Sequence, residues 1–326
     1  MNPQEPTGEE SRTIRVGALT RVEGEGALHV ILEQGRVQKV ELAIYEPPRF
    51  FEALLRGRPL EETPDITARI CGICPVAYQM TSIHALEMAL GVQITPEIRA
   101  LRRLLYCGEW IESHGVHMHL LHIPDFFDCA SSIELAKRFP EEVARGLRIK
   151  KIGNQLLEVL GGRAAHPVNV AVGGFYRSPR KTELMDLVEE IRWGIDAAIA
   201  VTRWVAGFDY PDFDAPCEMF ALSHASEYPM NEGKVTSTVD PTLNIPAEDF
   251  EQYFQERQVA QGRRVGILDP DKGRQAIHRK VREPHRVDLH SGQGRNVIIV
   301  EWGLRRRLHD EPHRLHQALL VARFEI

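Results

Sequence analysis

The feature that most restricts how this chain can fold is a pair of cysteines, Cys71 and Cys74, separated by two residues. Gly72 lies between them and Pro75 follows directly, a pattern typical of a short turn that leads into a helix. Both sulfurs of such a turn point the same way and can hold one metal ion. The start of a helix also favours the thiolate form of a cysteine, through the helix dipole and free N–H groups.

Spacing alone leaves three interpretations of this pair open: a redox-active pair, half of a metal site, or two structural cysteines. A structural zinc site needs a second cysteine pair, and Cys107, Cys129 and Cys217 do not provide that spacing. A thioredoxin-like redox turn needs a preceding strand, whereas the polar sequence Glu-Glu-Thr-Pro-Asp at residues 61–65 precedes this turn.

The composition of the chain is that of a folded protein with one or two domains. It has 326 residues, of which 43% are hydrophobic. The formal net charge of −6 argues against a general nucleic-acid-binding protein. Five cysteines, an odd and sparse set, do not predict a disulfide framework and favour a reducing compartment. With no signal-peptide pattern and no apolar run of membrane-spanning length, we expect a cytoplasmic protein that uses no membrane.

The order of the predicted elements indicates an α+β fold that is mainly helical. Alternating apolar residues predict strands over residues 13–18, 27–32 and 37–43, with a hairpin turn at Gln34-Gly35. A 3.6-residue periodicity and helix-capping residues then predict a series of helices. These are a short helix that begins before Glu52, and helices over residues 75–90, 96–122, 141–159, 181–205 and 247–258.

Capping residues define the two helices after the cysteine pair. Gly91 ends the first, and Thr95 and Pro96 are the N-cap and first residue of the second. We expect a buried apolar face at Val76, Met80, Ile83 and Leu86, and a second at Ile98, Leu101, Leu105 and Ile111.

Two further sets of side chains have a predicted environment. Four histidines crowd the end of the second helix, but no face collects three of them, so we expect packed polar groups rather than a metal site. They are His114, His117, His119 and His122. In the short helix near Glu52 we expect Phe50, Phe51 and Leu54 to be core residues.

Four short motifs together resemble a known family. They are Arg21-Val22-Glu23-Gly24, Pro48-Arg49-Phe50-Phe51-Glu52, Arg69-Ile70-Cys71-Gly72-Ile73-Cys74 and Glu112-Ser113-His114. Their order and spacing are similar to those of the large (alpha) subunit of nickel-iron hydrogenases, in particular the cytoplasmic, pyridine-nucleotide-linked branch. Residues 162–167 and 173–175 are similar to that branch as well. The resemblance extends from about residue 14 to about residue 258.

The resemblance implies a role for five residues. Cys71 would be a terminal nickel ligand, and Cys74 would be the thiolate that bridges nickel and iron. The iron would also carry diatomic ligands. Glu23 would move protons beside the metal. Glu52 would bind a magnesium ion, and Arg69 would shape the dry pocket around the iron's ligands. By spacing alone, Glu23 is a solvated loop carboxylate and Glu52 a helix-capping charge.

The fold and reaction implied by the resemblance are also specific. A small β-rich N-terminal part would pack on a long helical bundle. The reaction would be the reversible heterolytic cleavage of H2 into a hydride and a proton. Electrons would pass to a small iron-sulfur subunit, because this chain lacks the cysteines for a cluster, and then through further diaphorase-type subunits to a soluble carrier such as NAD(P).

The sequence departs from the family pattern in two places. Tyr78 stands where many members have histidine. The family's second cysteine pair, in the pattern Asp-Pro-Cys-x-x-Cys-x-x-His, is not found; Asp269-Pro270-Asp271 matches only its first two residues. Two cysteines cannot hold nickel in a four-thiolate geometry, so we expect this chain to be inactive as written.

The missing pair coincides with a change in composition. Residues 262–326 hold 14 basic and 8 acidic residues and six of the 14 histidines, whereas residues 1–261 hold 26 basic and 38 acidic residues. We therefore divide the chain into a hydrogenase-like domain, residues 13–261, and an atypical basic tail, residues 262–326. Our hypothesis is a frameshift near codon 260; a genuine divergent end that binds a partner is the alternative. An incomplete bundle would expose apolar surface and be poorly soluble.

Two other classes of protein remain as alternatives. One is a non-catalytic relative, such as the hydrogenase-derived subunit of respiratory complex I, although that line normally lacks these cysteines. The other is an independent CxxC redox or zinc protein, which leaves the other motifs unexplained. Bound nickel separates the hydrogenase from both.

Overall fold

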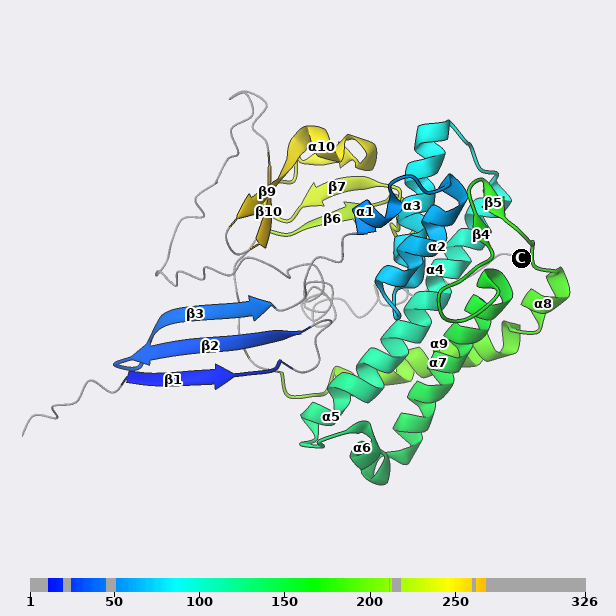
Figure 1. Cartoon of the computed structure of the whole chain (residues 1–326). Helices are drawn as coiled ribbons and strands as arrows, with labels where there is room; N and C mark the ends of the chain where they lie inside the picture. Colours follow the sequence, from blue (N-terminus) through cyan, green and yellow to red (C-terminus); the bar gives the residue numbers. More distant parts are fainter. Residues whose placement is uncertain are drawn as a thin grey trace, which may run out of the picture. The chain divides into compact units, whose positions relative to one another are not determined.

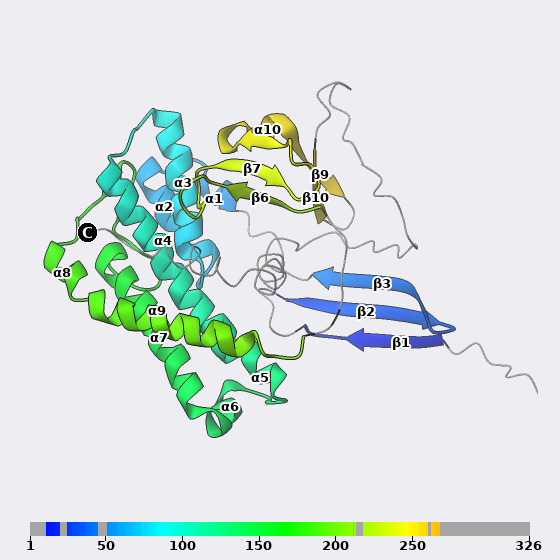
Figure 2. The same cartoon turned by 180° about the vertical axis from the view of Figure 1, so that it is seen from behind.

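The structure, a computed structural model, divides into two compact units (Figures 1 and 2). One unit consists of residues 47–211, and the other combines residues 1–46 with residues 212–326. The residues that the structure describes are 11–19, 25–44, 51–210, 212, 218–259 and 262–267.

The first unit, residues 47–211, is almost entirely helical. Short elements precede the cysteine pair, and long helices follow it. In chain order they are α1 (Phe51–Leu55), η1 (Leu60–Glu62), α2 (Thr63–Thr67), η2 (Ala68–Ile70), α3 (Pro75–Leu90), α4 (Pro96–Val116), η3 (His117–His122), α5 (Ile123–Phe126), α6 (Ser132–Arg138), α7 (Pro140–Gly161), the two-stranded β4 (Val170–Ala171) and β5 (Gly174–Phe175), α8 (Lys181–Met185) and α9 (Val188–Val205).

The limits of the long helices are those that their capping residues predict. Helix α3 begins at Pro75 and ends at Gly91, whose φ of 66° is left-handed. Helix α4 begins after Thr95, whose hydroxyl accepts the N–H of Ile98 at 3.4 Å. Gly162 ends α7 with a φ of 83°. The limits predicted for α3 and α4 are confirmed.

Helices α4 and α7 pack along each other through glycines, and α9 packs on α7 (Figures 1 and 2). Gly108 of α4 and Gly153 of α7 face each other at the crossing. A methyl group at Gly153 would lie 2.6 Å from the carbonyl oxygen of Gly108, so only glycine permits this approach. The large fully buried side chains of this unit include Val76, Met80, Ile83, Leu105, Leu156 and Leu160.

The end of α4 widens into one π-helical segment, η3, before α5 begins. His119 of this segment is 1% exposed, and its Nδ1 lies 3.0 Å from the carbonyl oxygen of Gly115. Its ring lies against Gly146 of α7, where a Cβ atom would clash with it. Beyond the segment, aromatic rings of Phe127, Phe139, Trp204 and Phe208 cluster.

The second unit contains antiparallel β structure. Strands β1–β3 form one sheet in chain order, and the turn between β2 and β3 places Gln34 and Gly35 at φ values of 50° and 72°. A second sheet pairs β6, β7 and β8 around buried Val235 and Ile245. The elements are β1 (Ser11–Val16), β2 (Gly26–Glu33), β3 (Arg36–Ile44), β6 (Phe220–Ser223), β7 (Lys234–Ser237), β8 (Asn244–Pro246), η4 (Ala247–Asp249), α10 (Phe250–Tyr253), β9 (Phe254–Val259) and β10 (Gly262–Ile267).

Three structural expectations are wrong. The helix expected over residues 247–258 is only two short turns, because Phe254 is buried beside Val235 and the chain continues as β9, paired with β10. The helix expected over residues 181–205 is interrupted after α8, where the N–H of Leu187 bonds to the carbonyl of Leu184. Leu54 is 53% exposed, because the five-residue α1 buries no side chain.

The α+β, mainly helical fold class is confirmed. Residues 268–326 lie outside the described residues, so the division of the chain at residue 261 stays a prediction. Within the described part, no helix has both the length and the apolar character needed to cross a membrane.

Candidate metal centre

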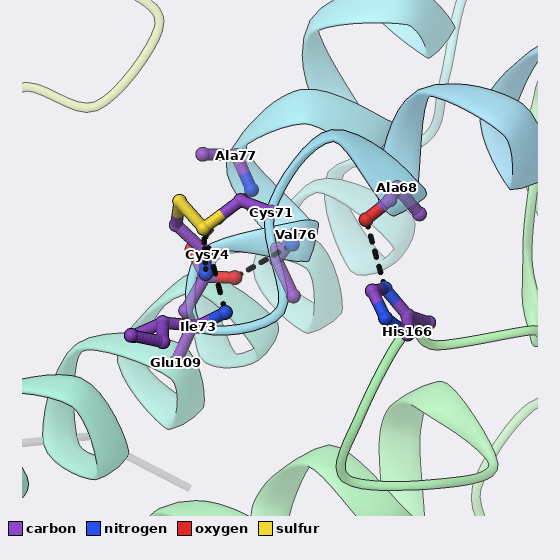
Figure 3. The surroundings of a disulfide bond; sticks show 8 residues. All are labelled: Ala68, Cys71, Ile73, Cys74, Val76, Ala77, Glu109 and His166. Atoms are coloured by element: carbon purple, nitrogen blue, oxygen red, sulfur yellow. Dashed lines mark hydrogen bonds between the residues drawn. A yellow bond between two sulfur atoms is a disulfide. The ribbon is translucent and has the colours of Figure 1, made fainter. Parts of the chain in front are cut away.

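The cysteine pair forms a turn between η2 and α3 (Figure 3). Cys71 has extended backbone angles, and Cys74 occupies the N-cap position of α3. Their Cα atoms are 5.4 Å apart, and the structure joins their sulfurs as a disulfide. The Cys71 sulfur accepts the N–H groups of Ile73 at 3.4 Å and Cys74 at 3.1 Å. The sequence therefore folds so that both sulfurs converge, as the spacing predicts.

A buried carboxylate from α4, Glu109, closes the start of α3. Its two oxygens accept the N–H groups of Val76 at 2.6 Å and Ala77 at 3.3 Å (Figure 3). The side chain is 2% exposed, and this burial raises the pKa of Glu109 to about 7, although the two N–H bonds act in the opposite direction. The sequence reasoning did not single out Glu109. The sequence does hold a signal that could have identified Glu109: it is a charged residue four positions after Leu105, on the predicted apolar face of the helix.

The other side of the turn is supported by the loop that follows α7. His166 has a left-handed φ of 49°, and its Nδ1 lies 2.8 Å from the carbonyl oxygen of Ala68, just before Arg69 (Figure 3). The amide of Gln79 donates to the carbonyl of Pro167 at 2.8 Å. A non-glycine residue in the left-handed region costs energy, so the surrounding contacts hold this conformation.

The other predicted site residues have different surroundings. Arg69 is exposed and donates to the carbonyl of Asp65 at 2.9 Å. Glu52 has a 91% exposed side chain and lies 3.5 Å from Arg56, its i+4 neighbour. Glu23 lies outside the described residues. The roles inferred for Glu23, Glu52 and Arg69 therefore stay predictions.

The donor set of the described part is a pair of sulfurs. Thiolates are soft ligands that suit nickel, so Cys71 and Cys74 fit two of the four positions of a four-thiolate site. Among the residues that the structure describes, no three or more His, Cys, Asp or Glu side chains gather in a way that could hold a metal ion. The four histidines at the end of α4 are among the residues searched, and their expected role as packed polar groups stays a prediction.

The surroundings of the pair also bear on the other two chemical interpretations. The 3-10 turn η2, not a strand, precedes Cys71, so the turn does not have the strand-to-helix context of a thioredoxin-like motif. A structural zinc site needs four ligands, and the described residues near the pair supply two.

Comparison with known proteins shows which family this chain resembles. Residues 49–146 match the family model of the nickel-dependent hydrogenases, and this range contains both cysteines and Glu109. This region of the chain is similar to the nickel-dependent hydrogenases. The chain is 42% identical to the alpha subunit of sulfhydrogenase 2 from Pyrococcus furiosus over 54% of its length, and 33% identical to that of sulfhydrogenase 1 from the same organism over 74% of its length.

Solved hydrogenases have the same fold. An NAD+-reducing [NiFe]-hydrogenase in the H2-reduced state superposes with a TM-score of 0.68 at 25% identity, covering 80% of this chain and 62% of that one. The NiFeSe hydrogenase of D. vulgaris Hildenborough superposes with a TM-score of 0.51 at 29% identity, covering 57% of this chain and 42% of that one.

The chain spans 43% and 57% of the length of the two sulfhydrogenase subunits. The predicted resemblance to a nickel-iron hydrogenase large subunit is confirmed. The activity, substrates and partners of the longer relatives are not thereby transferred to this chain.

Proposed function

We propose that this chain is part of the large subunit of a nickel-iron hydrogenase, an enzyme that cleaves H2 reversibly and heterolytically. The observation that carries the proposal is the turn of Cys71 and Cys74, which lies inside the matched family region at the start of a buried helix. We expect residues 1–326 to be inactive on their own, because a two-ligand site cannot hold nickel as four thiolates do.

Each chemical role falls to a named side chain. Cys71 and Cys74 would hold the nickel-iron centre as thiolates. When bound, the nickel-iron centre supplies Lewis-acid chemistry that separates hydride from proton. Glu23 accepts the proton and returns it in the reverse direction. Arg69 shapes the pocket and excludes water from it.

Magnesium binding by Glu52 is a further part of the proposal. Carboxylate oxygens are the ligands that magnesium prefers, and the Glu52 carboxylate is exposed to solvent, 3.5 Å from Arg56. Its companion ligands would come from other parts of the subunit.

The electron path requires partners. The proposal includes a small iron-sulfur subunit, further diaphorase-type subunits and a soluble carrier such as NAD(P), in the cytoplasm. The named activity of the solved NAD+-reducing hydrogenase supports the carrier.

Nickel binding by the reduced chain tests the proposal. Two thiolates suffice to bind added Ni2+ weakly, although not as a four-thiolate centre, so anaerobic titration should produce a sulfur-to-nickel charge-transfer absorption band, and Cys71→Ser or Cys74→Ser should abolish it. Cys107→Ser is the matched control, since Cys107 lies on α4 outside the turn, and should leave the band unchanged. Binding of one zinc per chain in preference to nickel would instead support a zinc protein.

A further inference from the structure

The N-terminus of α3 combines two demands that conflict chemically. Helix starts leave N–H groups without partners, and the N-cap side chain normally accepts one of them. Thr95 does this for α4, and Ser131 for α6. In α3 the N-cap residue is Cys74, whose side chain accepts no such bond. A cysteine that must face a metal cannot also cap its own helix.

Glu109 supplies the missing cap from another helix. Pro75, at the first position of α3, has no N–H, and Glu109 accepts the next two, from Val76 and Ala77. The Cys74 N–H bonds to the Cys71 sulfur, so each donor of the first turn has an acceptor. The carboxylate thus ties the first turn of α3 to α4.

The contacts of Glu109 indicate that this tie has a purpose beyond helix stability. In the described structure Glu109 has no cationic partner, whereas the other buried glutamate of this region, Glu87, is held by two hydrogen bonds from Arg102. Burying a carboxylate without a cation is costly. A serine or threonine at the N-cap would cap the helix at lower cost, but would remove Cys74.

The helix that carries Glu109 is a rigid support. Gly108, its neighbour, lies against Gly153 and Leu156 of α7, close enough that an added Cβ would be 3.0 Å from the Cβ of Leu156. Little sliding of α4 is possible at this crossing, so a group fixed to α4 is fixed in the core. The orientation of Cys74 follows from where Glu109 holds the first turn.

We propose that Glu109 is a positioning residue that caps α3 in place of Cys74 and thereby holds the sulfurs of Cys71 and Cys74 in convergence. The inference deepens the proposed function, since the converging sulfurs are its metal-binding pair, but the geometric claim concerns the turn itself. It therefore holds whether or not nickel is bound.

The test is the thiol–disulfide equilibrium of the intact chain with glutathione. Oxidised glutathione takes two electrons and two protons from the two cysteine thiols, giving one protein disulfide and two reduced glutathione molecules. The equilibrium constant measures the effective concentration of one thiol at the other. Glu109→Ala should lower it by roughly 2- to 30-fold, the range of lost helix caps. Glu109→Gln, whose carbonyl still accepts an N–H, should stay within about 3-fold of the original chain.

Glu158→Gln is the matched control. Glu158 is an exposed glutamate of α7, so the equilibrium constant of the Glu158→Gln variant should be unchanged, whereas Glu112 is unsuitable because its charge acts on Glu109. All constants are compared under conditions in which circular dichroism shows that each variant is folded. An unchanged constant for Glu109→Ala, or an equal drop for Glu158→Gln, would overturn the proposal.

Hydrogen exchange in the unmodified chain provides a test that does not depend on a variant folding. The amides of Val76 and Ala77 should exchange more slowly than those of Glu189 and Glu190, at the same positions of α9, whose N-cap residue Leu187 provides no side-chain bond. Equal exchange rates would also overturn the proposal. A chain that fails to bind nickel but shows the Glu109 effect would refute only the proposed function.

Discussion

His119 is a buried histidine whose titration should affect stability. Burial lowers the pKa of His119, assisted by Arg145 and opposed by its bond to Gly115 and by Glu142. The folded state therefore prefers the neutral ring, whereas the unfolded state takes up a proton near pH 6.5. The contribution of His119 is complete above that pH and declines as the pH falls below it.

The corresponding variant is His119→Phe, which keeps a ring against Gly146 and removes the titrating group. Between pH 7.5 and pH 5.5 the free energy of urea unfolding of the original chain should fall relative to that of the variant, because only the original chain carries the His119 ring. Glu109 has the opposite effect on the pH dependence of stability. Because its pKa is raised to about 7, its contribution to the free energy of unfolding falls as the pH rises from 4.5. The comparison is therefore made between variants, and equal slopes would contradict the assignment to His119.

At the scale of elements, one ion pair connects α3, α4 and the β4–β5 turn. Arg102 donates to the two oxygens of Glu87 at 2.9 and 2.7 Å and to the carbonyl of Ala171 at 3.1 Å, and Glu87 accepts the N–H of Gly173 at 2.7 Å. Burial raises the pKa of Glu87, but the bonds from Arg102 and Gly173 outweigh it and leave that pKa below its usual value. The pair is therefore ionised in the folded state.

Arg102→Met should destabilise the chain by about 3–5 kcal/mol, because it leaves the Glu87 carboxylate buried without a cation. The free energy of urea unfolding at pH 7 measures the loss. Arg192→Ala removes an exposed ion pair with Glu189 and should cost less than about 1 kcal/mol. Similar losses for both variants would show that burial does not govern the pair.

The close approach of α4 and α7 at Gly108 and Gly153 also predicts an effect on stability. Gly153→Ala should destabilise the chain by roughly 1–3 kcal/mol, because the new methyl group would meet the backbone of Gly108 and Glu112. Gly194→Ala on α9 is the control, because the atom nearest to the added methyl group would be at the flexible end of the Ile152 side chain, 3.2 Å away. The better helix propensity of alanine, up to about 1 kcal/mol, should make that change neutral or stabilising. Thermal unfolding of both variants distinguishes the two cases.

These elements show which parts of the fold could be predicted from the sequence. Helix limits depend on local chemistry, so Thr95 and Gly91 indicated them correctly. The end of the helix expected over residues 247–258 could not be predicted, because β9 depends on pairing with β10 and on the burial of Phe254. The cysteine turn was predicted from spacing, but Glu109 is brought to it by tertiary packing.

For the whole molecule, burial is uneven between the two units. The helical unit, residues 47–211, holds fully buried side chains such as Leu105 and Leu160 on its long helices. In the other unit, all six residues of β1 are exposed. Apolar side chains such as Met88 and Ile133 are also exposed on the helical unit, but single exposed side chains do not test the expectation of an exposed apolar surface. The expected poor solubility stays a prediction.

Uneven burial predicts uneven stability, because local opening costs least where few apolar side chains are buried. Hydrogen exchange of the chain by itself should therefore be at least about 100-fold faster in β1 than in the middle of α4 and α7. The same difference should broaden thermal unfolding, since the sheet can open while the helices remain folded. Exchange of both regions at one common rate, with a single sharp melting transition, would instead show that the two units unfold together. In that case the long helices would stabilise the sheet, and the helical unit could not be treated as independent of it.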